Sequence, residues 1–136
     1  MRRVFETQAA GASARAMHEL SIAYNIVEIA AGAAREAGVE RVGAVFLRLG
    51  AMAGVEKEPL RFGYGIAVEG TPLAGSRLEI EDVPLTIFCE LCGAERILDT
   101  IQDLRCPVCG TPSMDIRSGK EVEIAYLEVD DESANP

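Results

Sequence analysis

Hydrophobic positions in the first part of the chain change from a helical period to a strand pattern. From His18 to about Ala37, apolar residues recur at the spacing of a helix face, which predicts a long amphipathic helix. From Val42 to Gly50, apolar side chains occur on both alternating faces, which is typical of a buried strand. The chain is therefore predicted to begin its ordered part with a helix that leads into a buried strand.

The remaining hydrophobic pattern predicts a second helix and two further strands. Pro59 suits the first turn of a helix, and the apolar spacing continues to Val68. From Arg77 to Val83, apolar and acidic residues alternate as in a half-exposed strand, and residues 121–129 show the same alternation. All cysteines lie between these two strands. The pattern therefore predicts a small cysteine-containing module inserted between two strands of one sheet.

The four cysteines form two Cys-x-x-Cys-Gly turns: Cys89, Cys92 and Gly93, then Cys106, Cys109 and Gly110. Two such turns direct four thiolates toward one point, which predicts a closed structural zinc site in which every position is taken by protein. The same pattern also occurs in dithiol redox pairs, rubredoxin-like iron sites and disulfide pairs. Zinc is favoured over disulfides because an acidic chain without an export signal is expected in a reducing compartment, the cytoplasm.

Charge and composition narrow the range of partners. The chain has 13 basic and 22 acidic residues, a net charge of −9 and a pI near 4.6, which argues against a phosphate-backbone partner. It has no tryptophan, and aromatic residues make up 5%, which leaves little material for a base-stacking platform. No apolar run reaches the ~18 residues of a membrane helix. We therefore expect neither nucleic acid nor membrane as a partner.

The predicted fold is α+β: a small domain of two helices and a three-stranded mixed sheet, with an inserted four-cysteine zinc ribbon. Residues 17–84 and 119–130 are assigned to the α/β domain and residues 85–118 to the zinc module. Residues 131–136 form a polar tail. The ribbon interrupts the sheet in the sequence, so the strands on either side of it are expected to meet in space.

The first sixteen residues differ from the rest of the chain. Residues 1–16 are rich in arginine and alanine and show no periodic apolar pattern. We interpret them as a disordered extension, although a short organelle-targeting segment is an alternative. A third interpretation is that the reading frame was started too early and that Met17 is the true first residue.

Several short motifs between Met17 and Val129 form one recognisable combination. They are Met17-His18-Glu19-Leu20-Ser21, Gly54-Val55-Glu56, Leu60-Arg61-Phe62, Leu78-Glu79-Ile80-Glu81, the two cysteine turns and Gly119-Lys120-Glu121. Together they resemble the HypA/HybF family, the nickel-insertion accessory proteins of NiFe-hydrogenase maturation. The cysteine pattern alone is shared by many zinc ribbons. Its combination with Met-His-Glu ahead of an amphipathic helix is specific.

The resemblance implies a metallochaperone that carries Ni(II) and holds a structural Zn(II), and not an enzyme. It implies that His18 provides the nickel-binding imidazole, and that backbone nitrogens of His18 and Glu19 and the amine of Met17 complete the chelate. Such a planar nitrogen field suits Ni(II). In this chain Met17 follows sixteen residues, and with those residues attached it has an amide in place of the amine. Glu19 is a candidate for orienting the site or binding a partner. Glu56 is interpreted as a solvated loop carboxylate.

The resemblance also implies partners: a nickel-binding GTPase and the hydrogenase large subunit as recipient. A homodimer is compatible with it, and related accessory proteins also supply nickel to urease. The residues themselves offer no nucleophile and base pair and no Walker-type phosphate loop, so nucleotide hydrolysis is assigned to the partner. The alternative function is a zinc-ribbon protein-interaction adaptor without a nickel site.

Overall fold

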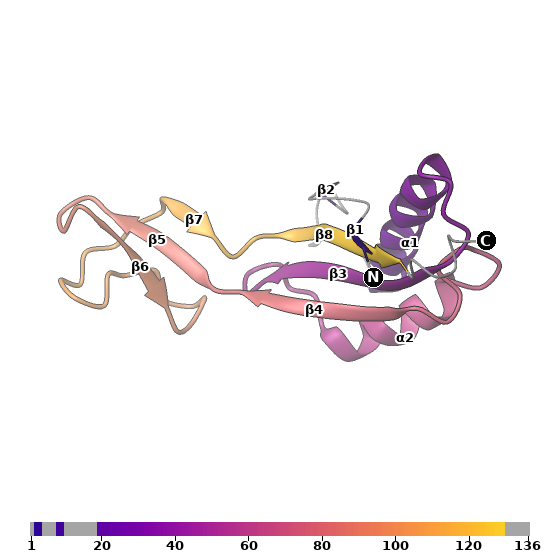
Figure 1. The fold of residues 1–136 in the computed structure, drawn as a ribbon. Coiled ribbons are helices and arrows are strands. Elements are labelled where there is room, and N and C mark those ends of the chain that lie inside the picture. Colours follow the sequence, from indigo (N-terminus) through magenta and orange to yellow (C-terminus); the bar gives the residue numbers. More distant parts are fainter. Residues whose placement is uncertain (1, 4–7, 10–18, 130–136) are drawn as a thin grey trace.

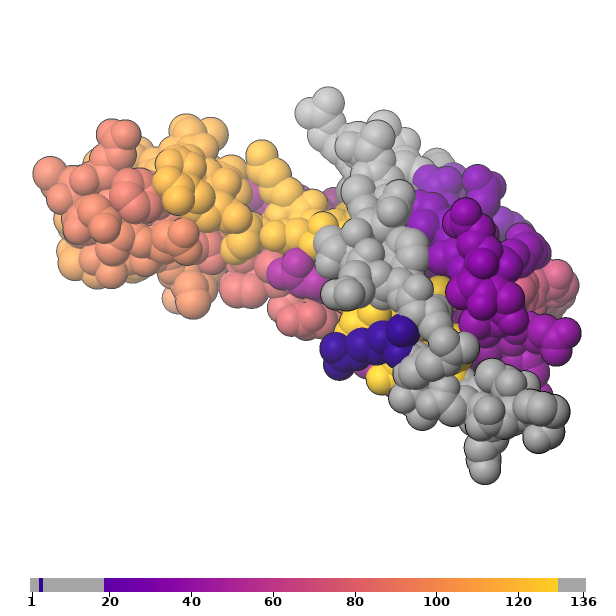
Figure 2. Space-filling view, turned by 45° about the horizontal axis from the view of Figure 1, so that its top comes forward, coloured from indigo at the N-terminus to yellow at the C-terminus, as the bar shows by residue number. Residues whose placement is uncertain are grey.

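The structure, a computed structural model, describes residues 2–3, 8–9 and 19–129. Its elongated body carries a sheet with two helices at one end and a smaller sheet at the other (Figure 1), and the space-filling view shows the smaller sheet projecting from the helix-bearing end (Figure 2). The elements are β1 Arg2–Arg3, β2 Gln8–Ala9, α1 Glu19–Glu36, β3 Val42–Gly50, α2 Lys57–Ala67, β4 Arg77–Val83, β5 Leu85–Cys89, β6 Ala94–Leu98, β7 Ile116–Ser118 and β8 Val122–Val129. The helices and strands predicted from the hydrophobic pattern are all present.

The larger sheet is organised around β3. This strand pairs in parallel with β4 and antiparallel with β8. Parallel pairing requires a crossover, and α2 lies in the connection between β3 and β4. Leu47 of β3 lies opposite both Ile80 of β4 and Ile124 of β8, so the register aligns apolar side chains across the three strands. The α+β fold class is therefore confirmed, and β4, β3 and β8 form the predicted three-stranded mixed sheet, to which β1 and β2 add at the β8 edge.

One hydrophobic core joins both helices to this sheet. The buried face of α1 consists of Ile22, Ala23, Ile26, Val27, Ala30, Ala31 and Ala34, and it belongs to the same core cluster as Val45, Leu47, Leu60, Ile124 and Leu127. The two helices approach closely at Gly63, where an added Cβ would lie 3.2 Å from the Cα of Leu20 and from the Cβ of Ala23. The hydrophobic stripe of α1 is thus core, as its period predicts.

Tyr64 of α2 gives this core a pH-dependent component. Its side chain is buried, and its hydroxyl lies 2.6 Å from Oγ of Ser76. Burial raises the pKa of Tyr64 to about 12, although the Ser76 hydrogen bond lowers it in part. The pKa of Tyr64 in the folded protein exceeds the unfolded value of about 10, so folding favours the neutral phenol. The contribution of this neutral phenol to the stability of the fold is complete below pH ~10 and is lost as the pH rises toward 12.

We expect the wild-type protein to lose roughly 2 kcal/mol of unfolding free energy through Tyr64 between pH ~9 and ~12. Tyr64→Phe should lack this component and should also be less stable by about 1 kcal/mol at neutral pH, because the Ser76 hydrogen bond is lost. Urea unfolding at several pH values measures both effects. Tyr24→Phe is the matched control, since Tyr24 is exposed. Identical pH profiles for wild type and Tyr64→Phe would contradict the prediction.

Two short segments of the leading residues pair with β8. Arg2 and Arg3 lie opposite Val129 and Glu128, and β2 pairs antiparallel with the same strand. The guanidinium of Arg3 lies 4.0 Å from the ring centroid of Tyr126. At these four residues the structure differs from the predicted disordered extension, because the edge of β8 facing away from β3 offers backbone groups to an extended chain. The other leading residues, and the tail 131–136, lie outside the described part.

The smaller sheet contains β5 at its centre, with β6 and β7 on either side. Leu85, Ile87 and Cys89 of β5 are buried, whereas every second residue of β6 is exposed. Because the segment lies between β4 and β8, it forms the inserted module of the predicted fold class. In the described part of the chain, neither helix is long and apolar enough to cross a membrane.

The turn after β3 is hydrogen-bonded to both segments that connect the two sheets. The backbone N–H groups of Gly50 and Met52 donate to the carbonyl oxygens of Glu121 and Gly119 at 2.7 and 2.6 Å, and that of Ala51 donates to the carbonyl of Val83 at 3.0 Å. These bonds hold the outgoing and returning segments of the module against the larger sheet.

Candidate metal centre

Each pair of cysteines lies on a tight turn of the same geometry. In the first turn the N–H of Gly93 donates to the carbonyl oxygen of Cys89 at 2.8 Å, and in the second the N–H of Gly110 donates to that of Cys106, also at 2.8 Å. Both glycines have a positive φ, 67° and 79°, which other residues rarely adopt. The glycine after each second cysteine therefore closes the turn that aims the two sulfurs to one side.

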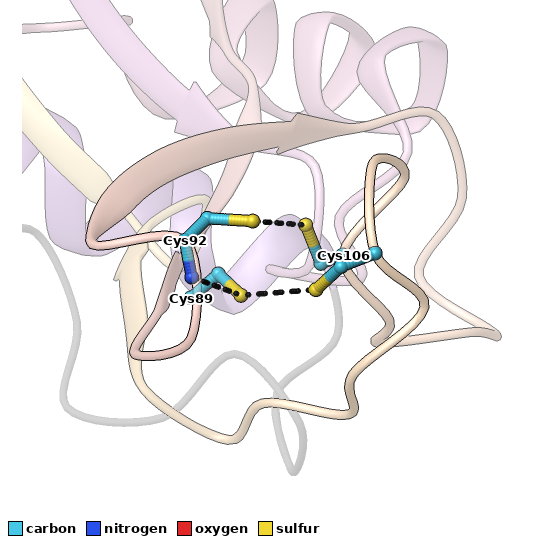
Figure 3. Close-up of side chains that lie close together, drawn as sticks. Cys89, Cys92 and Cys106 are labelled. Atoms are coloured by element: carbon cyan, nitrogen blue, oxygen red, sulfur yellow. Dashed lines mark hydrogen bonds between the residues drawn. The ribbon is translucent and has the colours of Figure 1, made fainter.

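The two turns bring all four sulfurs together. The Sγ atoms of Cys89, Cys92, Cys106 and Cys109 lie within 4.8 Å of one another. Cys89 and Cys109 are separated by 3.5 Å, and Cys92 and Cys106 by 3.9 Å (Figure 3). A tetrahedron with Zn–S bonds of about 2.3 Å has edges of about 3.8 Å. The distances thus match a closed four-thiolate metal site, and they exceed the disulfide bond length of about 2.05 Å.

Hydrogen bonds within the turns stabilise thiolates. The N–H of Cys92 donates to Sγ of Cys89 at 3.5 Å, and the N–H of Val108 donates to Sγ of Cys106 at 3.4 Å. Sγ of Cys109 lies 3.1 Å from Oγ1 of Thr111. Backbone donors of this kind favour the charged form of sulfur, the form that binds metal.

Three of the four thiols have shifted pKa values, and the shifts differ in direction. The backbone N–H of Cys109, together with that of Val108 and the Arg96 side chain, lowers the pKa of Cys106 to about 6 against the opposing effect of burial. Hydrogen bonds from Thr111 lower the pKa of Cys109. At Cys89 the backbone N–H of Cys92 lowers the pKa, but burial and the neighbouring thiols outweigh it and raise the value to about 11. The cluster thus holds negative charge near neutral pH, which favours a cation.

Arg96 of β6 belongs to this site, and the cysteine pattern does not reveal it. It lies opposite Ile87 of β5, in the register that places Ala94 opposite Cys89. The interaction of its guanidinium with the sulfurs of Cys92 and Cys106 raises the pKa of Arg96. Its Nε is buried without a hydrogen-bond partner in the described part of the chain. The signal in the sequence was the alternation of β6, which puts Arg96 and Ala94 on one face.

Of the predicted nickel residues, the structure describes only Glu19. Met17 and His18 lie outside the described residues, so their roles stay predictions. Glu19 opens α1, and its Oε2 accepts a hydrogen bond from the backbone N–H of Glu56 at 3.1 Å. Glu56 directly precedes α2, where a negative charge is favoured by the helix dipole. The structure therefore joins the starts of the two helices through Glu19.

Comparisons with known proteins agree with the resemblance drawn from the motifs. The profile of the family described as "Hydrogenase/urease nickel incorporation, metallochaperone, hypA" matches residues 17–129. The hydrogenase maturation factor HypA of Chloroflexus aggregans is 54% identical over 112 residues, which cover 82% of this chain and 98% of that protein. The corresponding protein of Roseiflexus sp. (strain RS-1) is 50% identical over 117 residues, covering 86% and 95% of the two chains.

Solved structures show the same fold at lower sequence identity. The solution structure of the Ni metallochaperone HypA from Helicobacter pylori superimposes with a TM-score of 0.60 at 18% identity, over 83% of this chain and 97% of that chain. A second solution structure of a HypA protein gives a TM-score of 0.62, also at 18% identity. Since the family profile spans most of the chain and relatives are 50–54% identical over 82–86% of it, the chain belongs to the HypA family, which consists of nickel-incorporation metallochaperones and not of catalytic enzymes.

Proposed function

We propose that this protein binds Ni(II) at Met17-His18-Glu19 and delivers it, together with a nickel-binding GTPase, to the large subunit of NiFe-hydrogenase. The observation that carries the proposal is the family match, which begins at Met17 and therefore starts on the Met-His-Glu motif itself. Urease is a second possible recipient, because the family description names both enzymes.

The chemistry of the motif supports nickel as the cargo. An amine, backbone nitrogens and an imidazole from consecutive residues form fused small chelate rings in one plane, a geometry that suits Ni(II) better than Zn(II). Glu19 would act here as a positioning residue. Its side chain accepts a hydrogen bond from the backbone of Glu56, which anchors the first turn of α1 at the last residue of the proposed chelate.

We assign zinc to Cys89, Cys92, Cys106 and Cys109. The distances between their sulfurs fit the tetrahedron of a zinc tetrathiolate. A zinc ion with four protein ligands has no open position for water or substrate, so it would stabilise the module and take no part in a reaction. Zinc is assigned over iron because the family resemblance implies it.

Exposed apolar side chains near the start of α1 support a protein partner. Leu20 and Tyr24 of α1 and Phe62 and Ile66 of α2 are each at least 43% exposed. The Leu20 side chain also lies against Gly63, where the two helices meet, so these residues flank one helix contact. Exposed apolar surface of this kind commonly marks a protein interaction site. We assign this interaction to the GTPase or a second copy of the chain, in the cytoplasm.

Nickel titration of a chain that starts at Met17 tests the proposed site. We expect about one equivalent of Ni(II) per chain with square-planar absorption, abolished by His18→Ala while zinc stays bound. Glu28→Gln is the control on the same helix, since Glu28 is exposed and should not alter nickel binding. Full nickel binding by His18→Ala would move the site elsewhere. Absence of nickel binding in the wild type would favour the adaptor function.

The same titration on the chain that starts at Met1 examines the role of the Met17 amine. An amine with a pKa of about 8 loses its proton readily, whereas the amide formed with Ala16 does not. We expect the longer chain to bind nickel at least about tenfold more weakly, a difference of about 1.4 kcal/mol, or with a different spectrum. Equal affinity and identical spectra would remove the amine from the ligand set and leave His18 with side chains such as Glu19 or Glu56.

A further inference from the structure

We infer that Arg96 is a positioning residue of the four-cysteine site, which ties the two cysteine turns together, offsets part of the charge of the metal-bound thiolates and slows the loss of zinc. The inference rests on the zinc assignment proposed above. It concerns the affinity of the site for zinc and the rate of zinc release, which the four ligands alone do not determine.

The strand register directs Arg96 toward the metal centre. Residues directly opposite each other in an antiparallel pair point to the same face. Arg96 is paired with Ile87, and Ile87 and Cys89 lie two residues apart on the buried face of β5. The Arg96 side chain therefore emerges on the face from which Cys89 reaches the cluster.

The guanidinium lies near one sulfur from each turn. Its interaction with Cys92, from the first turn, and with Cys106, from the second, raises the pKa of Arg96. These two sulfurs also face each other across the cluster, 3.9 Å apart (Figure 3). A planar guanidinium presents several N–H donors in a fixed geometry, so it can bond two acceptors at once. Arg96 is thereby placed to fix the distance between the two turns.

Donors are distributed over the four sulfurs in a complementary way. Cys89 accepts from the N–H of Cys92, Cys106 accepts from the N–H of Val108, and Cys109 pairs with Thr111. At Cys92, to which no backbone N–H donates in the described part of the chain, the neighbouring cation is Arg96. Loss of the Arg96 side chain should therefore affect Cys92 most, and Cys106 next.

The charges of the module point to the same role. Four thiolates and one Zn²⁺ carry a net charge of about −2, which a nearby cation stabilises. Other arginines of the module are engaged with carboxylates: Arg105 with Asp103 at 3.4 Å, and Arg117 with Asp115 at 2.8 Å. The buried Nε of Arg96 has no hydrogen-bond partner in the described part of the chain, and the interaction of its guanidinium with Cys92 and Cys106 raises its pKa.

A hydrogen bond from a cation reduces the electron density on a thiolate and hence its nucleophilicity. Iodoacetamide measures this property, because the sulfur attacks its methylene carbon, iodide leaves, and the resulting thioether is a poor zinc ligand. Removing Arg96 should therefore accelerate alkylation at Cys92 and Cys106 and release zinc sooner.

The experiment uses the full chain, loaded with zinc, as wild type, Arg96→Met, Arg96→Lys and Arg105→Met. Arg105→Met is the matched control, because it removes the same charge from a side chain that is 66% exposed and paired with Asp103. Zinc release in iodoacetamide is followed with a chromogenic chelator, and mass spectrometry identifies the cysteine that is alkylated first.

We expect Arg96→Met to bind zinc about 10- to 100-fold more weakly and to release it correspondingly faster, the usual effect of removing a residue that supports a metal ligand. Alkylation should begin at Cys92 and Cys106, Arg96→Lys should be intermediate, and Arg105→Met should match the wild type.

Wild-type release rates in Arg96→Met would overturn the inference, as would an unchanged order of cysteine alkylation. If Arg96→Met cannot be loaded with zinc at all, the lysine variant decides: zinc binding restored by Lys supports the inference, and a failure to bind overturns it. A wild-type protein that contains no zinc would instead refute the zinc assignment itself.

Discussion

Replacing Cys92 with serine is expected to abolish zinc binding and to unfold the β5–β7 module while the helix-bearing sheet stays folded. Structural zinc supplies folding free energy on the order of 10 kcal/mol in small modules. The module has little to replace it, because its buried apolar side chains are concentrated on β5, whereas Ile97 of β6 is 65% exposed. The larger sheet has its own core, which includes both helices.

Metal analysis combined with hydrogen exchange measures this effect. In Cys92→Ser, or in the wild type treated with a chelator, protection should be lost in β5 and β6 and kept in β3. Glu90→Gln is the matched control, because Glu90 lies in the same turn and is exposed. Zinc retained at one equivalent in Cys92→Ser, or iron in the wild type, would contradict the assignment. Loss of protection throughout β3 would show that the two sheets unfold as one unit.

Gly50→Ala should destabilise the junction between the two sheets by about 3 kcal/mol or more, the upper range for forcing extra atoms into a packed site. An added Cβ at Gly50 would lie 2.1 Å from the carbonyl oxygen of Gly119 and 2.6 Å from the backbone nitrogen of Glu121. These are backbone atoms, so no side-chain rotation relieves the clash. The hydrogen bonds from Gly50 and Met52 to the same segment would also be lost or lengthened.

Chemical denaturation quantifies the loss, and amide chemical shifts of residues 83–85 and 118–122 would locate it. Gly65→Ala is the control, because a Cβ at Gly65 meets no atom within 4 Å and alanine favours the interior of α2. It should leave stability unchanged or raise it by up to about 1 kcal/mol. A Gly50→Ala protein as stable as the wild type would show that the backbone at the junction can move apart without loss of stability.

The sequence alone determined the elements and the metal cluster. Helix α1 and strand β3 could be predicted because burial of one face imposes a period on neighbouring residues, and that period is readable within a short window. The cysteine cluster could be predicted because each Cys-x-x-Cys-Gly turn positions its two sulfurs locally. The family could be inferred because the Met-His-Glu motif and these turns occur together. The nickel role of His18 remains a prediction.

Only the tertiary structure decided which distant residues meet. It paired Glu19 with the backbone of Glu56, brought Gly50 against Gly119, and placed Arg2–Arg3 on the edge of β8. It also paired Arg96 with Ile87, next to the pair of Ala94 and Cys89. These contacts depend on chain crossings and strand register, which no local period encodes, since a shift of one residue would send Arg96 to the opposite face.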